Sequence, residues 1–147
     1  MNTLNSIIRG REVYSLKQEM TVLEAARYMT DKRVGAAAVL DGERVVGVFS
    51  ERDLMTRIVV PGVPADRTRL ADVMTRNIVV SAPQDTLEEG LRKMQQAKCR
   101  HLPVVEDSHL LGFISLRDLL QVELEEKDEE NRFLNEYIHS IPASAGK

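Results

Sequence analysis

Hydrophobic and polar stretches follow one another in the same order twice along this chain. Each copy opens with a short apolar segment. It continues with apolar residues at intervals of three and four, the spacing of an amphipathic helix. Two apolar runs separated by polar turn residues then predict a β-hairpin, and a second helix follows it. This order of strand, helix, strand, strand and helix is typical of a mixed α/β fold.

The two copies place these elements at corresponding residues. In the first copy, the predicted strands lie at residues 13–15, 36–40 and 45–49. The predicted helices begin at a T-x-x-E capping box at 21–24 and at Ser50. In the second copy, the predicted strands lie at residues 78–80, 102–105 and 110–114, and the predicted helices begin at a capping box at 86–89 and at Ser115. A loop with two prolines separates the copies at 60–66, and residues 67–75 predict a short helix.

An internal repeat relates the copies. Shifting the sequence by 65 positions aligns residues 13–59 with 78–124 without a gap, and 10 of the 47 aligned pairs are identical. The clearest match joins GVFSERDL at 47–54 to GFISLRDL at 112–119. Two repeats are too few for a solenoid. We therefore expect a pseudo-twofold pair in which each half covers the apolar face of the other.

The C-terminal part of the chain lies outside this repeat. The helix from Ser115 is predicted to run long, through an acidic stretch at 123–130 and into apolar residues at helical spacing. Those apolar residues are Phe133, Leu134, Tyr137, Ile138 and Ile141. This stripe packs either on its own domain or on a second subunit of a homodimer. The expected division is residues 1–66 for the first repeat with its N-terminal segment and linker, 67–124 for the second repeat, and 125–147 for the C-terminal helix and tail.

Composition narrows the classes of function. Hydrophobic residues make up 43% of the 147-residue chain and charged residues 29%, as in a globular protein with a core. The formal net charge of -3 argues against a sequence-independent nucleic-acid binder, which needs an excess of Lys and Arg. No apolar run has the length of a membrane span, and the N-terminus lacks the pattern of a signal peptide. We therefore expect a cytoplasmic protein.

The chain offers little for metal or covalent chemistry. Cys99 is its only cysteine, so neither an intramolecular disulfide nor a cysteine-based zinc site can form, and its three histidines are dispersed. The sequence has no P-loop and no nucleophile elbow. Cys99 takes the place of Val34 in the other copy, which favours a small hydrophobe at a strand edge. We expect no metal site, no catalytic cofactor and no enzyme.

Candidate ligand contacts lie where the last helix of each copy begins. Ser50 and Asp53, like Ser115 and Asp118, have the S-x-x-D spacing of a helix cap. The same groups suit a nucleotide, because a helix N-terminus and a serine hydroxyl donate to phosphate, and an aspartate accepts from ribose hydroxyls. Both interpretations stay open. The arginines within the two motifs, either solvated or in contact with phosphate, are Arg52 and Arg117.

Each copy resembles a CBS domain, and the pair resembles a Bateman module. The resemblance covers residues 10–124. It rests on the gapless duplication, the order of elements, the segment RHLPVVE at 100–106, and the pattern Gly-φ-φ-Ser-x-x-Asp-Leu, in which φ is apolar. Such modules commonly hold adenine-containing ligands (AMP, ADP, ATP, NAD or S-adenosylmethionine) in two clefts, and they often pair into dimers. The resemblance implies a stand-alone regulatory module.

The resemblance also assigns residues to the two clefts. It implies that Asp53 and Asp118 contact ribose and that Ser50 and Ser115 lie near ribose or phosphate. It also implies that backbone groups of the segment entering each hairpin form hydrogen bonds with the adenine edge. The apolar segment that begins each copy is then expected to lie against the adenine face. These segments contribute Gly35, Ala36, Ala37, Arg100, His101, Leu102, Pro103, Val13 and Ile78.

The two clefts are expected to be unequal. The second copy has Arg100 and His101 where the first has Gly35 and Ala36, and a guanidinium suits phosphate oxygens whereas glycine supplies no charge. His101 is alternatively a half-buried histidine that contacts no ligand. The expected function is a sensor that binds an adenine nucleotide and acts on a partner protein. The alternative is a dimeric scaffold of the same fold that binds no ligand.

Overall fold

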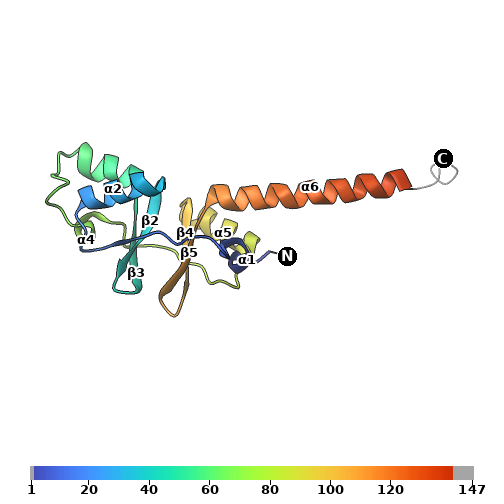
Figure 1. The fold of residues 1–147 in the computed structure, drawn as a ribbon, viewed down its shortest axis with the longest axis horizontal. Helices are drawn as coiled ribbons and strands as arrows, with labels where there is room; N and C mark the ends of the chain where they lie inside the picture. The colour runs from blue at the N-terminus through green and yellow to red at the C-terminus, as the bar shows by residue number, and fades with distance from the viewer. Residues whose placement is uncertain (1, 141–147) are drawn as a thin grey trace.

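The computed structural model of the protein describes residues 2–140 (Figure 1). Its strands are β1 (Ser15–Lys17), β2 (Ala36–Asp41), β3 (Arg44–Ser50), β4 (His101–Glu106) and β5 (His109–Ser115). Its helices are α1 (Leu4–Ile8), α2 (Val22–Lys32), α3 (Glu51–Asp53), the π-helix η1 (Leu54–Val59), α4 (Leu70–Val73), α5 (Leu87–Ala97) and α6 (Leu116–Ser140). The strands form one sheet in the order β1-β2-β3-β5-β4.

Two antiparallel hairpins, β2-β3 and β4-β5, form the centres of two matching repeats. A helix precedes each hairpin and begins at a threonine cap. The Thr21 and Thr86 hydroxyl oxygens each accept a hydrogen bond of 3.1 Å from the backbone N–H three residues later. The predicted mixed α/β fold of two pseudo-symmetric repeats is therefore confirmed.

The segments that open the two repeats differ. The first forms β1, three residues paired in parallel with β2. The predicted strand at 78–80 is wrong, because only Ser81 bridges this region to β4. The Pro103 carbonyl accepts from the Ser81 N–H at 2.9 Å, but Pro103 has no N–H to donate on that side, whereas the matching residue Ala38 has one. The strand edge in the second repeat therefore lacks a donor.

Two helices also depart from their predicted form. The helix that begins after Ser50 starts as the short α3 and continues as the π-helix η1, in which the Val60 N–H donates to the Met55 carbonyl at 3.0 Å. The helix predicted at 67–75 is shorter and spans only Leu70–Val73 as α4. Both changes lie in the first repeat or in its connection to the second.

Each repeat has its own hydrophobic core, which a short helix from the other side of the chain completes. α1 precedes the first repeat but packs on the second, where Ile8 lies against Gly112. α4 precedes the second repeat but packs on the first, where Met74 lies against Gly47. A Cβ atom at either glycine would lie 2.8 Å from its nearest neighbour, so only glycine permits this approach. The two halves are thus interlocked.

The two hairpins meet at their tips. Arg44 of β3 is in register with His109 of β5, and the His109 Nε2 atom lies 2.8 Å from Glu43 Oε2. The Val45 N–H also donates to the Ser108 carbonyl at 3.3 Å. These contacts connect the strands of the two repeats into one sheet.

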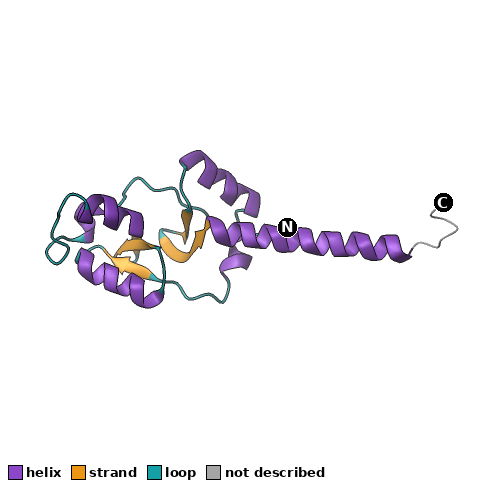
Figure 2. Ribbon diagram, turned by 90° about the horizontal axis from the view of Figure 1, so that it is seen from above, coloured by secondary structure: helices purple, strands orange, loops and turns teal. Residues whose placement is uncertain are grey.

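α6 projects away from the rest of the molecule (Figure 1), and Figure 2 shows the same projection from above. Its first turns pack on the core of the second repeat through Leu116, Leu119 and Val122. The apolar residues farther along α6 are exposed, which contradicts packing of this stripe on its own domain. They are Phe133, Leu134, Tyr137 and Ile138. Ile141 lies outside the described residues.

Candidate functional site

A cleft of about 500 Å³ lies between the repeats. The first repeat contributes Gly35, the end of β3 and the start of α3, and the second contributes the segment 75–79, the end of α5 and the start of β4. The predicted site residues among its lining are Gly35, Ser50, Arg52, Asp53, Ile78, Arg100, His101 and Pro103. The cleft therefore combines the helix start of one repeat with the strand entry of the other.

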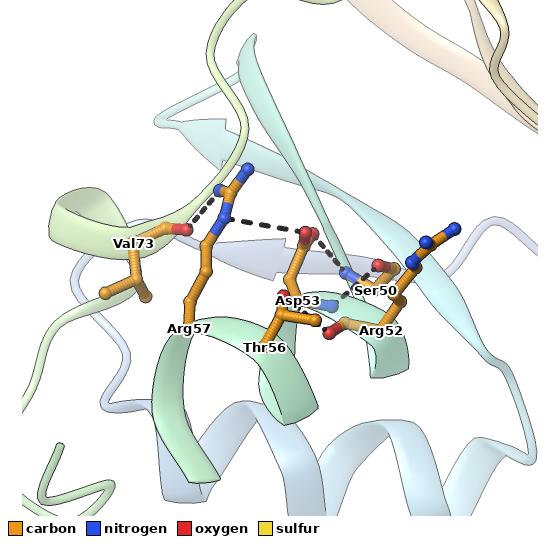
Figure 3. A network of polar contacts seen from close by, with 6 residues as sticks. All are labelled: Ser50, Arg52, Asp53, Thr56, Arg57 and Val73. Carbon is orange, nitrogen blue, oxygen red and sulfur yellow. Dashed lines mark hydrogen bonds and ion pairs between the residues drawn. The ribbon is translucent and has the colours of Figure 1, made fainter. Parts of the chain in front are cut away.

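Ser50 and Asp53 form a reciprocal cap at the start of α3 (Figure 3). The Ser50 N–H donates to Asp53 Oδ2 at 3.0 Å, and the Asp53 N–H donates to Ser50 Oγ at 3.2 Å. The structural interpretation of this motif is thus correct. The cap uses the serine oxygen only as an acceptor, so the hydroxyl proton stays available to a ligand.

An arginine of η1 holds the second oxygen of the Asp53 carboxylate. Arg57 Nε lies 3.7 Å from Asp53 Oδ1, and Arg57 Nη1 donates to the Val73 carbonyl at 2.7 Å (Figure 3). Arg57 therefore links η1 to α4. The side chain of Arg52 extends on the Ser50 side of Asp53 instead and lines the cleft.

The opposite wall of the cleft comes from the second repeat. Val48 of β3 and Thr75 exchange two backbone hydrogen bonds of 2.9 Å, and this pairing carries the chain along the sheet to Ile78 and Val79. These two apolar residues line the cleft. Lys98 caps the C-terminal end of α5 in the left-handed conformation, with φ of 54°, and the chain then turns through Arg100 into β4. One wall is thus apolar and the next is cationic.

His101 lies between the two helix starts. Its ring stacks on Phe113 with centroids 5.3 Å apart and an interplanar angle of 13°. Burial lowers the pKa of His101 from its ordinary value, and the Arg100 charge acts in the same direction, whereas the Asp118 and Glu51 carboxylates oppose it. His101 is therefore neutral at neutral pH, and its imidazole offers a donor and an acceptor rather than a charge.

The cleft combines three kinds of chemistry. Its anionic residues are Glu51 and Asp53, and its apolar wall consists of Ile78 and Val79. Three cationic residues also line the cleft, namely Arg52, Lys98 and Arg100. An aspartate beside an apolar wall accepts hydroxyl protons while the wall covers a flat apolar group, and guanidinium and ammonium groups bind phosphate oxygens. The arrangement suits a ligand that carries all three features.

The second helix start has the same cap but a different partner. The Ser115 N–H donates to Asp118 Oδ2 at 2.9 Å, and the Asp118 N–H donates to Ser115 Oγ at 3.0 Å. Arg11, which lies between α1 and β1, places Nη1 3.3 Å from Asp118 Oδ2. The chain's own guanidinium therefore contacts the carboxylate that the sequence assigned to a second ligand.

The other predicted site residues lie outside the cleft at Asp53. Ala36, Ala37 and Leu102 are buried in β2 and β4, so their side chains belong to the strands' packed faces. Val13 and Arg117 are exposed. Arg100 and His101 also lie beside the helix start of their own repeat, because the Leu116 N–H donates to the Arg100 carbonyl at 2.7 Å and the Asp118 carboxylate acts on the pKa of His101. Their side chains line the cleft at Asp53.

Several lining residues were not predicted. They are Val48, Glu51, Thr75, Asn77, Val79, Ala97, Lys98 and Cys99. Glu51, Asn77 and Lys98 lie one or two positions from predicted residues, so extending each motif by that distance finds them. Thr75 carries no such signal, because it enters the cleft only through its pairing with β3.

Residues 2–140 contain neither a candidate metal cluster nor a candidate membrane-spanning helix. No group of three or more His, Cys, Asp or Glu residues in this part of the chain is placed to hold a metal ion. None of the described helices is both long and apolar enough to cross a membrane.

Comparison with known proteins identifies the family of the chain. A family model described as CBS domain matches it twice, at residues 8–60 and 70–125. The chain belongs to the CBS-domain family. Among curated proteins, this CBS pair is 30% identical over 123 residues to CBS domain-containing protein CBSX3, mitochondrial, of Arabidopsis thaliana, covering 80% of this chain and 60% of that protein. It spans 20% and 26% of two longer relatives from the same plant.

Solved structures of CBS proteins have the same fold. A putative signal-transduction protein with CBS domains from Burkholderia ambifaria has a TM-score of 0.78 and 29% identity, over 84% of this CBS pair and 95% of that chain. CBS domain protein PAE2072 from Pyrobaculum aerophilum, which was solved in complex with AMP, has a TM-score of 0.73 and 26% identity, over 80% of this chain and 89% of that one.

Proposed function

We propose that this CBS pair is a regulatory module that binds an adenine nucleotide of the AMP, ADP, ATP or NAD type in the cleft at Asp53. The observation that carries the proposal is the meeting of Asp53, the apolar pair Ile78 and Val79, and the cations Lys98 and Arg100 in one cleft of about 500 Å³. The AMP complex of PAE2072, a relative with the same fold, supports the choice of ligand.

Each part of the nucleotide has a proposed contact in this cleft. The Asp53 carboxylate accepts from the ribose hydroxyls, and the free hydroxyl proton of Ser50 donates to ribose or phosphate. Lys98 and Arg100 bind the phosphate, as a point charge and as a planar fork respectively. Ile78 and Val79 lie against the adenine and contribute most of the burial energy, while the polar contacts set ligand identity.

The regulatory role requires a partner and two states of the module. A nucleotide shifts an equilibrium only if it binds one state better than the other. We propose that the module acts without catalysis on a partner protein and as a homodimer, which the exposed apolar residues of α6 support. The cytoplasmic location stays a prediction from the sequence.

The test is a thermal-shift and calorimetry panel on the purified chain with AMP, ADP, ATP, NAD and S-adenosylmethionine, and with GMP as the base control. At least one adenine ligand is expected to raise the melting temperature, because a ligand that binds only the folded state stabilises it. Asp53→Ala is expected to lower the affinity for that ligand by about 10-fold to 100-fold, which is the contribution of a hydrogen bond to a charged group.

Asp118→Ala is the matched control, because it removes an equivalent cap outside this cleft. Both variants lose about 0.5–2 kcal/mol of stability as lost caps, but only Asp53→Ala is expected to lose affinity. If no ligand in the panel changes the melting temperature and both variants change stability alone, the ligand-independent scaffold is the better description.

A further inference from the structure

The outer part of α6 carries a stripe of residues at alternating intervals of four and three. We name it the seam, and it consists of Leu120, Leu124, Lys127, Asn131, Leu134 and Ile138. Its four apolar members are exposed, with 44%, 59%, 54% and 61% of the residue surface accessible in the order given. The mean spacing of 3.5 residues keeps such a stripe in contact with another helix along its whole length, when the two helices supercoil.

The seam is not the face with which α6 packs on its own module. That contact uses Leu116, Leu119 and Val122, and Leu119 is fully buried where it approaches Gly90. Beyond these turns α6 leaves the module, as Figures 1 and 2 show. A helix that projects into solvent owes most of its stability in proteins to packing of an apolar face, so the seam calls for a partner helix.

The residue types along the seam select the partner. In the heptad that fits this spacing, the first core positions are Leu124, Asn131 and Ile138. The second core positions are Leu120, Lys127 and Leu134. A branched residue such as Ile138 in the first position with leucine in the second favours two parallel strands. An asparagine in the first position pairs best with the same asparagine across a parallel dimer, which also fixes the register.

We propose that α6 forms a parallel two-stranded coiled coil with α6 of a second copy of this chain. The proposal deepens the homodimer that belongs to the proposed function, and it does not require a nucleotide in the cleft. The two modules then lie at the same end of the coiled coil, because each α6 begins at its own module.

The charges beside the seam limit the strength of this pairing. Glu123 and Asp128 occupy the flanking positions that face each other across a parallel dimer, so they repel. Lys127 lies 4.0 Å from Glu123 of its own helix and offsets part of this charge. Because salt screens the repulsion of exposed charges, the dimer is expected to become tighter as ionic strength rises.

The first experiment measures association of the full-length chain without nucleotide, by analytical ultracentrifugation from micromolar to near-millimolar concentration at low and high salt. The wild-type chain is expected to form dimers, more tightly at high salt. Leu134→Glu and Ile138→Glu each place a charge in the seam of both copies, and we expect each to raise the dissociation constant by at least about 100-fold.

Phe133→Glu is the matched control, because it makes the same change next to Leu134 but on an exposed side chain outside the seam. It is expected to leave the dissociation constant within about threefold of wild type. The proposal is wrong if the wild-type chain stays monomeric, if α6 pairs only with a different helix, or if Leu134→Glu and Phe133→Glu behave alike.

The second experiment tests the parallel register. Asn131→Cys in a Cys99→Ser chain is expected to oxidise to a covalent dimer, because first core positions face each other in a parallel pair and not in an antiparallel one. A lack of cross-linking in a chain that still dimerises overturns the parallel arrangement. Nucleotide binding is measured separately on Leu134→Glu, and dimerisation separately on Asp53→Ala, so failure of the coiled coil and failure of the cleft are distinguishable.

Discussion

The two helix starts of this protein share a motif and a cap but have different surroundings. Asp53 and Asp118 each complete the same reciprocal cap with a serine three residues earlier. Asp53 is paired with Arg57 of its own helical segment, whereas Asp118 is paired with Arg11, which comes from the far end of the chain. A repeated sequence motif thus forms the same local structure twice, whereas the neighbouring residues that define a site come from other parts of the chain.

The segments that open the two repeats also occupy corresponding positions but have different surroundings. Leu16 is fully buried in β1, and the corresponding Ser81 is also buried but carries a hydroxyl group without a hydrogen-bond partner among the described residues. The first repeat therefore buries an apolar side chain where the second buries an unsatisfied polar one. This difference accompanies the loss of the strand at 78–80 and leaves that segment to form the cleft wall.

Leu16→Ala is expected to have the largest effect on stability, and the matching variant Ser81→Ala a smaller effect of opposite sign. Leu16→Ala removes a buried side chain and costs about 2–5 kcal/mol of unfolding free energy. Ser81→Ala removes an unpaired buried hydroxyl and is expected to gain about 1 kcal/mol. Urea unfolding of both variants measures the difference. A loss of stability in Ser81→Ala would show that the hydroxyl has a partner in solution.

Gly47→Ala and Gly112→Ala test the interlocking of the repeats. The new Cβ would lie 2.8 Å from the Thr75 carbonyl oxygen at Gly47 and 2.8 Å from Ile8 Cγ2 at Gly112. Both variants are expected to lose about 1–3 kcal/mol of stability by overpacking. Only Gly47→Ala displaces the segment that walls the cleft, so only this variant is expected to weaken nucleotide binding in calorimetry. Equal binding losses would contradict the placement of the cleft.

Arg11→Ala tests the pairing that distinguishes Asp118. Both side chains of this ion pair are partly exposed to solvent, so the pair contributes at most about 1 kcal/mol. The variant is expected to leave affinity in the cleft at Asp53 unchanged and to lower the melting temperature by a small amount that vanishes at high salt. A change in affinity at Asp53, measured by calorimetry, would mean that the two helix starts are coupled.

The smallest expected effects concern His101 and His109, whose pKa values shift in opposite directions from about 6.5. Burial lowers the pKa of His101, so stability is lost as pH falls below the ordinary value, where the unfolded chain takes up the proton. The hydrogen bond to Glu43 raises the pKa of His109, so its contribution is present at low pH and lost as pH rises through the raised pKa.

Proton NMR titration of the folded chain, with His101→Gln and His109→Gln for assignment, measures both midpoints. His101 is expected to titrate below about 6.5 and His109 above it. Glu43→Gln is expected to return His109 toward its ordinary pKa without affecting His101. Identical midpoints for the two histidines would contradict the burial of His101 between the helix starts.

Much of the fold followed from residues that are close together in sequence. The caps at Thr21 and Thr86, the hairpins and the helix starts at Ser50 and Ser115 depend on hydrogen bonds that span a few residues, so local patterns predict them. The gapless shift of 65 positions then predicts two copies of one unit. The strand at 78–80 failed because its pairing depends on the missing N–H of Pro103, more than twenty residues away.

The sequence by itself determined that this protein has two equal caps, one cationic strand entry at Arg100 and an apolar stripe beyond the repeat. Only the tertiary structure decided that Arg100 and Asp53 line the same cleft, that Arg11 contacts Asp118, and that α6 leaves its stripe exposed. The physical reason is that a cap needs only neighbouring residues, whereas a cleft is made by segments that meet when the two repeats interlock through α1 and α4.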